Sequence, residues 1–291
     1  MTKSILFFSM VFLTFACPLT HAQEIVYQKE DSLFIENVLQ RHVHEQNNRI
    51  VISIAKDFAE ACTEYVGGTL DAYNEEPLFV SCSKLDCTTF AELVLAMAFT
   101  KKENRNGFDA VCSNLEKIRY RNGLRNGYKS RLHYISWWIT DSAKRDIIEE
   151  VVTPLHTAVQ NLNLNFMSCN SDKYPLLAND NTLQKEIAGY EKPFQEIDIA
   201  YIPKGLLNAS PEQLDIKDGD IIAIVTGIKG LDVTHLGFAI WKGEKLHMLH
   251  ASSGKGKVVN DSTTLYDYMK NKKMNLGIRV FRMKEDTTSH N

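Results

Sequence analysis

The sequence reads LDCTTFAELVLAM over residues 85–97. From Phe90 onward, apolar residues recur at i, i+3, i+4 and i+7, which is the spacing of one helical face. The pattern predicts a helix that begins at Cys87, with its apolar face in the core and the cysteine at an exposed tip. A helix N-terminus offers partial positive charge and free N–H groups, which favour a thiolate. We therefore expect the pKa of Cys87 to be lowered and its thiol to be reactive at neutral pH.

Two strand-like stretches farther along the chain each carry a histidine near one end. His235 begins the stretch HLGFAIW at residues 235–241, and His250 lies near the end of KLHMLHA at 245–251. The residues Lys-Gly-Glu at 242–244 are typical of a turn. A hairpin with this turn places the two histidines side by side.

These histidines complete a candidate catalytic constellation with the cysteine. We assign His235 as the base that pairs with the thiol of Cys87, and His250 as the group that orients His235. His247 has the opposite strand parity to His250 and is expected to point to the other face of the sheet. A single strand histidine is more often structural, but the three residues together favour a cysteine-dependent hydrolase.

The order of the predicted elements indicates an α+β fold in a single domain over residues 23–291. Helices precede the strands, and the strands follow one another without intervening long helices, as in an antiparallel sheet. The span of about 100–197 is expected to be an insertion or cap within this domain. Helical spacing predicts helices over about 32–45, 51–65, 87–97, 108–118, 142–152, 183–190 and 264–270, and period-two alternation predicts strands over 199–202, 220–225, 235–241, 245–251 and 277–283.

The first residues have the composition of an export signal. Lys3 precedes an apolar run, and Thr20, His21 and Ala22 form a small-residue cleavage site. We expect a signal peptide over residues 1–22, export to a bacterial periplasm, and no membrane span after cleavage. Lipid anchoring through Cys17 is the alternative, but the residues before it fit a lipidation box poorly.

Composition excludes several classes of function. The 291 residues are 44% hydrophobic and 24% charged, as in an ordinary globular protein. A formal charge of −3 leaves no basic excess for phosphate neutralisation, so no nucleic-acid partner is predicted. Cysteine and histidine spacings match no metal motif, so neither a metal nor a cofactor is predicted. Downstream of the signal the cysteine number is odd, which leaves at least one free thiol; a local Cys82–Cys87 disulfide is the competing possibility.

An aromatic segment near residue 134 is a candidate substrate subsite, because saccharide faces stack on Trp and Tyr rings. The alternative, that the two tryptophans are ordinary core residues, is equally compatible with the sequence. The candidates for substrate contact are Arg131, His133, Tyr134, Trp137 and Trp138.

The three motifs resemble those of the NlpC-like cysteine peptidases and amidases, which have a papain-like core and act on the bacterial cell wall. That family shows Asp-Cys-Ser-Gly-Phe at a helix start, then His-Val-Gly and His-Ala-Ser on successive strands. The present sequence reads DCTTF at 86–90, HLG at 235–237 and HAS at 250–252. The resemblance makes Asp86 and Thr88, which flank the cysteine, further candidates for substrate contact.

Two departures from the compact NlpC-like members point to one branch of the superfamily. Thr89 replaces the usual glycine, and the separation between Cys87 and His235 is unusually long. Both departures, and the segment SRLHY at 130–134, are similar to the N-acetylmuramoyl-L-alanine amidase-like branch. The resemblance implies a papain-like core with a large helical and irregular insertion between the cysteine and the histidine.

The activity implied by this resemblance is hydrolysis of the amide between N-acetylmuramic acid and L-alanine in peptidoglycan. The reaction would proceed through a thioester on Cys87, with muropeptides as substrates. Two alternatives stay open. One is a γ-D-glutamyl–diamino acid endopeptidase that cuts the stem peptide, and the other is a non-catalytic wall-binding protein.

Overall fold

The structure is a computed structural model that describes residues 24–45, 49–73 and 75–284. The predicted signal peptide at 1–22 and Cys17 lie outside the described residues. Within the described ranges, no helix is long and apolar enough to cross a membrane.

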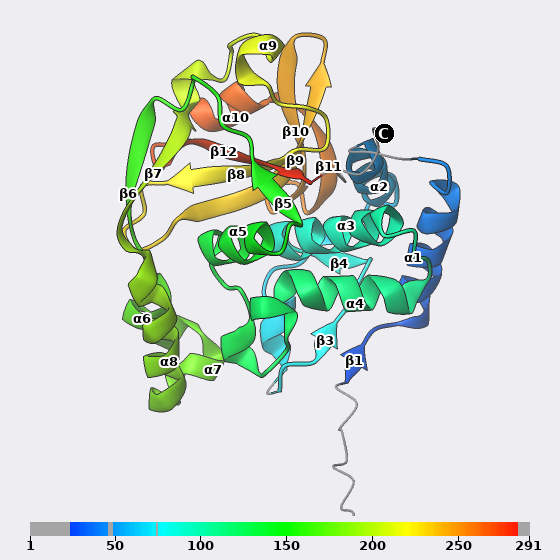
Figure 1. The fold of residues 1–291 in the computed structure, drawn as a ribbon, viewed down its shortest axis with the longest axis vertical. Coiled ribbons are helices and arrows are strands. Elements are labelled where there is room, and N and C mark those ends of the chain that lie inside the picture. The colour runs from blue at the N-terminus through cyan, green and yellow to red at the C-terminus, as the bar shows by residue number, and fades with distance from the viewer. Residues whose placement is uncertain (1–23, 46–48, 74, 285–291) are drawn as a thin grey trace, which may run out of the picture.

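A large mixed sheet forms the centre of the molecule (Figure 1). Its strand order is β4-β2-β11-β10-β9-β8-β12-β7-β6, and β5 also pairs with β12. The ladders are antiparallel except for β2 with β4, which is parallel. The sheet strands are β2 (Glu64–Tyr65), β4 (Lys84–Leu85), β5 (Ile148–Glu150), β6 (Ala158–Asn163), β7 (Gln195–Pro203), β8 (Ile221–Thr226), β9 (Val233–Lys242), β10 (Lys245–Ser252), β11 (Lys257–Thr264) and β12 (Asn275–Met283). A separate parallel pair joins β1 (Ile25–Val26) to β3 (Leu78–Phe79).

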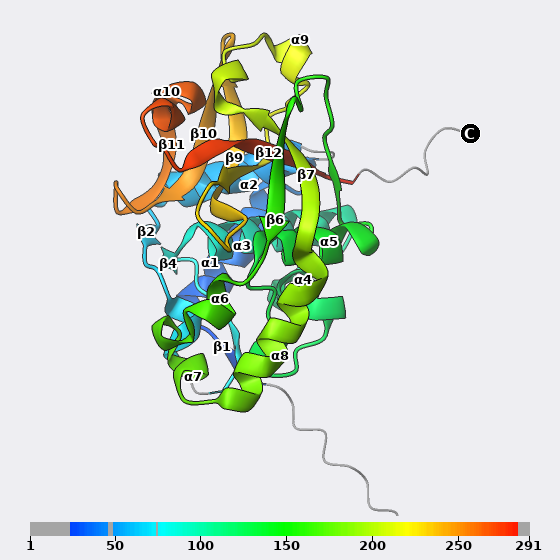
Figure 2. The same cartoon turned by 90° about the vertical axis from the view of Figure 1, so that its left-hand side faces the viewer.

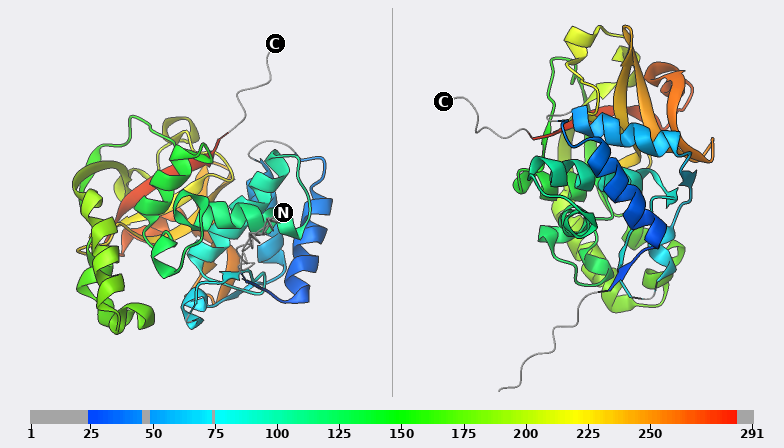
Figure 3. Two further views of the ribbon diagram at one scale, coloured as in Figure 1. Left: turned by 60° about the horizontal axis from the view of Figure 1, so that its bottom comes forward. Right: turned by 90° about the vertical axis from the view of Figure 1, so that its right-hand side faces the viewer.

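Helices cover both faces of the sheet. The larger helical layer lies on one face, and two short helices lie on the other (Figure 1). The right-hand view of Figure 3 shows α2, the lighter blue helix, next to the orange strands. The helices are α1 (Lys29–Arg41), α2 (Arg49–Glu60), α3 (Cys87–Lys102), α4 (Phe108–Arg119) and α5 (Ile135–Lys144) in the larger layer, α9 (Pro211–Leu214) and α10 (Leu265–Lys270) on the opposite face, and α6 (Phe166–Cys169), α7 (Pro175–Ala178) and α8 (Asn181–Glu191) beyond the sheet.

The α3 helix is the centre of the larger layer. It contacts α2 and α4 as well as β9 and β10. From Thr89 to Ala98 all of its side chains are buried, so the helix is enclosed on all sides and does not expose a polar face. The sequence predicted the helix and its start at Cys87, but predicted only one buried face.

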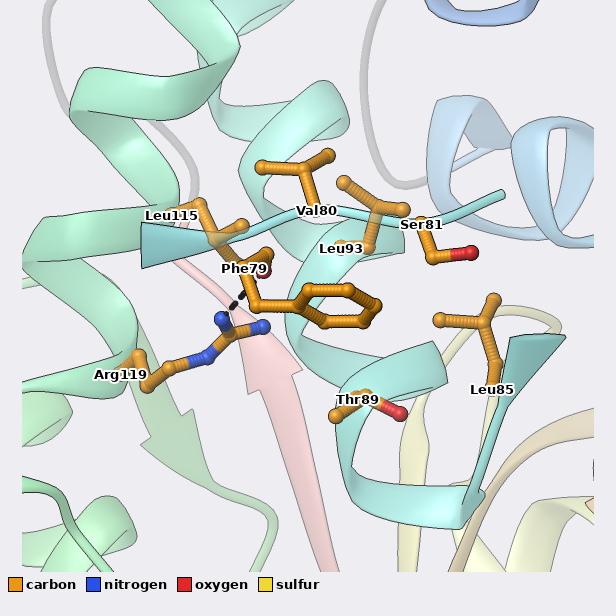
Figure 4. A pocket seen from close by; sticks show the side chains of 8 residues that line it. All are labelled: Phe79, Val80, Ser81, Leu85, Thr89, Leu93, Leu115 and Arg119. Carbon is orange, nitrogen blue, oxygen red and sulfur yellow. Dashed lines mark hydrogen bonds between the residues drawn. The ribbon is translucent and has the colours of Figure 1, made fainter. Parts of the chain in front are cut away.

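A buried ion pair joins α3 to α4. Arg119 Nε lies 2.7 Å from Glu92 Oε2, and both side chains are almost completely buried. Arg119 Nη1 also donates to the carbonyl oxygen of Phe79, 2.7 Å away, which ties the pair to β3. Figure 4 shows this arginine at the edge of a small apolar cavity that Thr89, in the first turn of α3, also lines. The contacts of Arg119 thus fix α3 against α4 and β3.

Some predicted element boundaries were wrong. The second helix ends at Glu60, because Cys62 adopts a left-handed φ of 55° and the next residues form β2. The helix predicted over 142–152 instead begins at Ile135 and ends at Lys144. Residues Ile148–Glu150 then form β5, because β12 offers them a backbone partner. This pairing is a tertiary contact that local sequence does not encode.

The strands that frame the candidate histidines agree with the prediction, whereas β6 and β11 were missed. The β9–β10 hairpin pairs Lys242 with Lys245, and Gly243 adopts a φ of 60° in the turn. β11 reads KVVNDSTT and has little apolar alternation, so only its pairing with β10 identifies it. The predicted helix over 264–270 is α10, capped by Thr264.

The span of about 100–197, predicted to be an insertion or cap, shares its core with the sheet. Side chains of α4 and α5, including Leu115 and Trp138, share one core cluster with Ile221 and Phe238 of the sheet. Farther along, β6 and β7 pair antiparallel and extend the sheet toward α8, which lies between them in the chain (Figure 2). The helices α6, α7 and α8 lie beyond the sheet, and their buried side chains Met167, Leu177 and Ile187 belong to the same core cluster.

The buried ion pair gives a stability prediction. Arg119→Met leaves the Glu92 carboxylate buried without its partner, so unfolding free energy should fall by about 3–5 kcal/mol. The double variant Glu92→Met, Arg119→Met removes both charges and should be less destabilised than the single variant. Urea denaturation followed by circular dichroism measures both effects. Equal stability of the Arg119→Met variant and the unmodified protein would show that the pair does not hold α3 in place.

Candidate active site

Cys87 is the first residue of α3, and Asp86 caps the helix. The Asp86 Oδ1 atom accepts hydrogen bonds from the backbone N–H groups of Thr88 and Thr89, at 3.1 and 2.8 Å. The Thr89 hydroxyl accepts from the Asp86 N–H at 2.9 Å, which completes a capping box. The Asp86 carboxylate, a candidate for substrate contact, is therefore used in starting the helix. Thr89 takes part in the same cap, which gives a structural role to the residue found in place of glycine.

A pocket of about 100 Å³ contains both Cys87 and His235. Cys87 is partly buried, so it is not the exposed tip that the sequence predicted. The Thr88 hydroxyl lies 4.0 Å from the Cys87 sulfur and remains a candidate for substrate contact. The pocket is lined by Cys87, Thr88, His133, Ile135, Leu231, Asp232, Val233, Thr234, His235 and Leu236.

The β9–β10 hairpin brings the two candidate histidines together, as predicted. His235 Nε2 lies 2.6 Å from His250 Nδ1, and the two rings are nearly perpendicular. His250 is completely buried, whereas His235 is partly exposed and reaches the pocket. Tyr268 of α10 packs against both rings, with ring centroids 6.3 and 5.5 Å away.

Gly237 allows the two histidines to approach each other. A Cβ atom at this position would lie 2.5 Å from Met248 Cγ and 2.9 Å from His250 Cβ, distances that are too short for real contacts. The glycine of the HLG motif is therefore needed for space between β9 and β10.

Asp261, on β11, lies next to His250, and the sequence did not predict it as a residue of the site. Its Oδ2 atom is 3.5 Å from His250 Nε2, and Lys255 donates to Oδ1 at 2.8 Å. The residue could not be found because β11 was not recognised as a strand. His247 is separate from this group: its Nδ1 atom contacts the backbone oxygens of Asp261 and Thr263 at 3.1 and 3.0 Å.

Most of the aromatic segment near residue 134 is core. Trp137 and Trp138 are each 1% exposed, and Tyr134 is 2% exposed. The Tyr134 hydroxyl donates to Glu191 Oε1 and accepts from the N–H of Met167, both at 2.7 Å. These three side chains present no ring face to a saccharide, so the core interpretation fits them.

Arg131 is also buried, and its guanidinium group is paired with carboxylates of the protein itself. Its Nη1 and Nη2 atoms lie 2.9 Å from Asp71 Oδ1 and Glu76 Oε2, respectively. Of the segment's candidates, only His133 lines the pocket with Cys87. His133 Nε2 lies 2.9 Å from the carbonyl oxygen of Tyr128, which fixes the ring at the pocket wall.

Two further residues lie near the cysteine. Asp232 lines the pocket, is 2% exposed, and accepts from the N–H groups of Ser136 and Val233. It thereby joins the start of β9 to the first turn of α5. Tyr65 of β2 has a raised pKa, caused by burial and then by the nearby charges of Cys87 and Asp86. Sequence reasoning missed Tyr65 because it placed the residue at the end of a helix.

All five cysteines of the described residues are free thiols. The Cys82–Cys87 disulfide is therefore absent, and the thiol of Cys87 is available. Within the described ranges, no group of three or more His, Cys, Asp or Glu side chains is placed to hold a metal ion.

Comparison with known proteins identifies the family. The family model for AmiA-like, N-acetylmuramoyl-L-alanine amidase-like proteins matches residues 54–278. The chain belongs to this amidase-like family. No curated protein matches the sequence.

Solved structures agree with this assignment. An N-acetylmuramoyl-L-alanine amidase from Bacteroides uniformis is 36% identical, with a TM-score of 0.76 over 82% of this chain and 99% of that one. A Bacteroides fragilis protein, provisionally described as a xylanase, is 41% identical, with a TM-score of 0.73 over 80% of this chain and all of that one. A Legionella pneumophila protein at 23% identity and a TM-score of 0.66 over 88% and 95% of the two chains shares the fold.

The site of this amidase-like protein is desolvated in its free form. Burial, with a smaller contribution from Asp86, raises the pKa of the Cys87 thiol to about 11. Hydrogen bonds from the Leu236 N–H, the Thr88 hydroxyl and the Cys87 N–H act in the opposite direction but do not outweigh burial. The expectation of a lowered thiol pKa was therefore wrong, because burial of the thiol outweighs the hydrogen bonds that favour the thiolate.

Burial also keeps the imidazoles neutral. It lowers the pKa of His235 to about 3, with help from His250 and from the charge of Lys272. The pKa of His250 is lowered by burial, although Asp261 partly compensates. The free protein therefore holds a neutral thiol and a neutral imidazole at pH 7.

This state predicts a pH dependence for alkylation of Cys87. Below a thiol pKa of about 11, the thiolate fraction rises with pH, so the iodoacetamide rate should climb about tenfold per unit from roughly pH 6 to 9. Replacement of the exposed Cys62 and Cys169 by serine leaves Cys87 as the accessible thiol among those described. Mass spectrometry of the labelled protein gives the rate. A rate that is constant below pH 8 would indicate a thiolate–imidazolium pair and contradict this account.

Proposed function

We propose that the protein is a peptidoglycan amidase that cleaves the amide between N-acetylmuramic acid and L-alanine, with Cys87 as the nucleophile. Membership of the amidase-like family and similarity to the B. uniformis amidase support the substrate. The observation that carries the mechanism is one pocket that holds Cys87 and His235, with His235 Nε2 bonded to His250 at 2.6 Å. We also propose a papain-like core, since a helix-initial cysteine faces histidines on an antiparallel sheet.

The first half of the reaction forms a thioester. His235 takes the proton from the Cys87 thiol as the sulfur attacks the lactyl carbonyl carbon, and the carbonyl electrons move to oxygen. When the carbonyl re-forms, the C–N bond breaks, and His235 gives its proton to the departing alanine nitrogen. Because the thiol and imidazole are neutral at rest, proton transfer accompanies attack.

The second half hydrolyses the thioester. A water molecule loses its proton to His235 and attacks the same carbon, and the Cys87 sulfur leaves and recovers a proton. The N–H groups of Leu236 and Cys87, which hydrogen-bond to the sulfur, are candidates to stabilise the oxyanion. Each well-placed donor of this kind is typically worth about 3–4 kcal/mol in the transition state.

The site gives little support to glycoside hydrolysis, despite the xylanase description of one relative. That reaction generally needs two carboxyl groups that flank the scissile bond. Asp86 and Asp232 lie at the site, but each accepts backbone hydrogen bonds at a helix start. These two carboxylates therefore stabilise helix starts and are poorly placed for acid–base work on a sugar.

Product analysis of purified muropeptides tests this function. The wild-type protein should release a disaccharide with a free lactyl carboxyl group and a peptide that begins with L-alanine. Cys87→Ala should abolish release and keep the fold, because it removes the nucleophilic sulfur and no other non-hydrogen atom. Cys169→Ser, at an exposed thiol, is the matched control and should be fully active. Liquid chromatography with mass spectrometry identifies the products.

Other outcomes of that experiment have distinct meanings. Fragments cut inside the stem peptide would identify an endopeptidase instead. Turnover by the Cys87→Ala variant would exclude the cysteine mechanism. Binding of muropeptides without any product would indicate a wall-binding protein, and sugar release from xylan would indicate a glycosidase.

Export to the periplasm is a second part of the proposal. It is supported by the apolar run and the small-residue site that ends at Ala22. When the full sequence is expressed in a Gram-negative host, N-terminal sequencing of the periplasmic protein should begin at Gln23. Recovery only in the cytoplasm with the first residues intact, or a lipid on Cys17, would contradict this cleavage.

A further inference from the structure

The contact between the two histidines continues to a carboxylate on β11. Asp261 is 4% exposed, and its two oxygens have different partners. Lys255 Nζ and the Thr263 N–H both donate to Oδ1 at 2.8 Å. Oδ2 is left facing His250 Nε2 at 3.5 Å. The carboxylate is thus held in one orientation by two donors on one side, with its other oxygen directed at His250.

Asp261 is ionised throughout the neutral range. Burial alone would raise its pKa, but the hydrogen bonds from Lys255 and Thr263 outweigh burial and hold the pKa well below its usual range. An ionised carboxylate can only accept hydrogen bonds. The hydrogen between Asp261 and His250 must therefore be on His250 Nε2.

This hydrogen determines the tautomers of both rings. A neutral imidazole carries one N–H, so His250 Nδ1 is an acceptor when Nε2 is the donor. His250 Nδ1 faces His235 Nε2 at 2.6 Å, so His235 Nε2 must be the donor of that bond. The remaining nitrogen, His235 Nδ1, then has no hydrogen and is free to accept a proton.

We propose that Asp261 is a positioning residue that sets the tautomers of His250 and His235, and so leaves His235 Nδ1 as the base for the Cys87 thiol. This inference rests on the proposed function, in which His235 takes the thiol proton. No proton moves to Asp261 in this scheme. When His235 becomes an imidazolium, its Nε2–H continues to donate to His250, which Asp261 keeps as an acceptor.

The other charged and titratable groups around His235 and His250 do not determine which nitrogen of each ring carries the hydrogen. Lys272 and Tyr268 lie on the α10 side, where the Lys272 ammonium is 3.3 Å from the centre of the Tyr268 ring. Lys272 makes a proton on either histidine less favourable, but it does not distinguish the two nitrogens of a ring. Lys255 acts through Asp261.

The asymmetric partners of Asp261 make an isosteric replacement informative. In Asp261→Asn, Lys255 and Thr263 still donate to one side of the group, so the amide oxygen should occupy that side. The amide NH₂ then faces His250 Nε2 and requires it to accept. His250 Nδ1 must carry the hydrogen, His235 Nε2 becomes the acceptor, and His235 Nδ1 becomes protonated. The variant should therefore reverse both tautomers and block the base.

Tautomers can be read without any substrate. Long-range ¹H–¹⁵N spectra of histidine-labelled protein at pH 7 separate the two neutral forms, and His235→Gln and His250→Gln variants assign the signals. We expect Nε2–H forms for both histidines in the wild type, and Nδ1–H forms in Asp261→Asn. Lys255→Met keeps the carboxylate and should retain the wild-type pattern. An Nδ1–H form of His250 in the wild type, or unchanged tautomers in Asp261→Asn, would overturn the inference.

Kinetics give the functional consequence. Asp261→Asn should lower kcat on muropeptides by about 100-fold or more, as expected when an oriented histidine takes the wrong tautomer, with KM little changed. Asp198→Asn, at an exposed residue of β7, is the matched control and should leave kcat unchanged. An unchanged kcat in Asp261→Asn would contradict the positioning role. If the wild type is inactive on muropeptides but shows the expected tautomers, the proposed function fails and the assignment of Asp261 stands.

Discussion

The enclosure of α3 is the constraint on which the rest of the structure depends. The helix lies between the sheet and α4, with buried side chains all round from Thr89 to Ala98. Asp86 fixes where it begins, and the Glu92–Arg119 pair fixes it against its neighbour. Its first residue, Cys87, is consequently held at the wall formed by the start of β9. If the helix were less enclosed, the same sequence motif would not hold the Cys87 sulfur in one position beside His235.

The same enclosure determines the chemistry of the site. Burial raises the pKa of Cys87 and lowers that of His235, so the free protein holds both groups neutral. A neutral pair needs a base with a free lone pair at the moment of attack. In the mechanism that we propose, the order of hydrogen bonds from Asp261 through His250 supplies that base at His235 without placing a permanent charge in the pocket. Burial that keeps both groups neutral and a fixed tautomer of His235 would therefore act together in this mechanism.

Local sequence was sufficient for the elements that carry strong periodic signals. The start of α3 at Cys87 follows from an Asp cap and an apolar repeat, and the β9–β10 hairpin follows from alternation around Gly243. The hairpin places His235 next to His250, which is why the juxtaposition of the two histidines could be predicted. β11 and β5 have weak patterns and exist as strands through their partners, so Asp261 was not found. Trp137 and Trp138 were ambiguous because an aromatic segment has the same composition in a core as in a subsite. The direction of the shift in the Cys87 pKa was not predicted, because the burial of a residue at a helix start depends on which side chains from other elements pack over it.

The central claim is that Cys87 attacks the substrate and carries its acyl group. Rapid acid quenching during turnover of muropeptides, followed by mass spectrometry of the digested protein, tests this claim most directly. The account predicts that the muramyl acyl group is found as a thioester on the peptide that contains Cys87, and that added hydroxylamine captures it as a hydroxamate. Turnover with Cys87 unmodified at every time point, and no hydroxamate, would contradict the account.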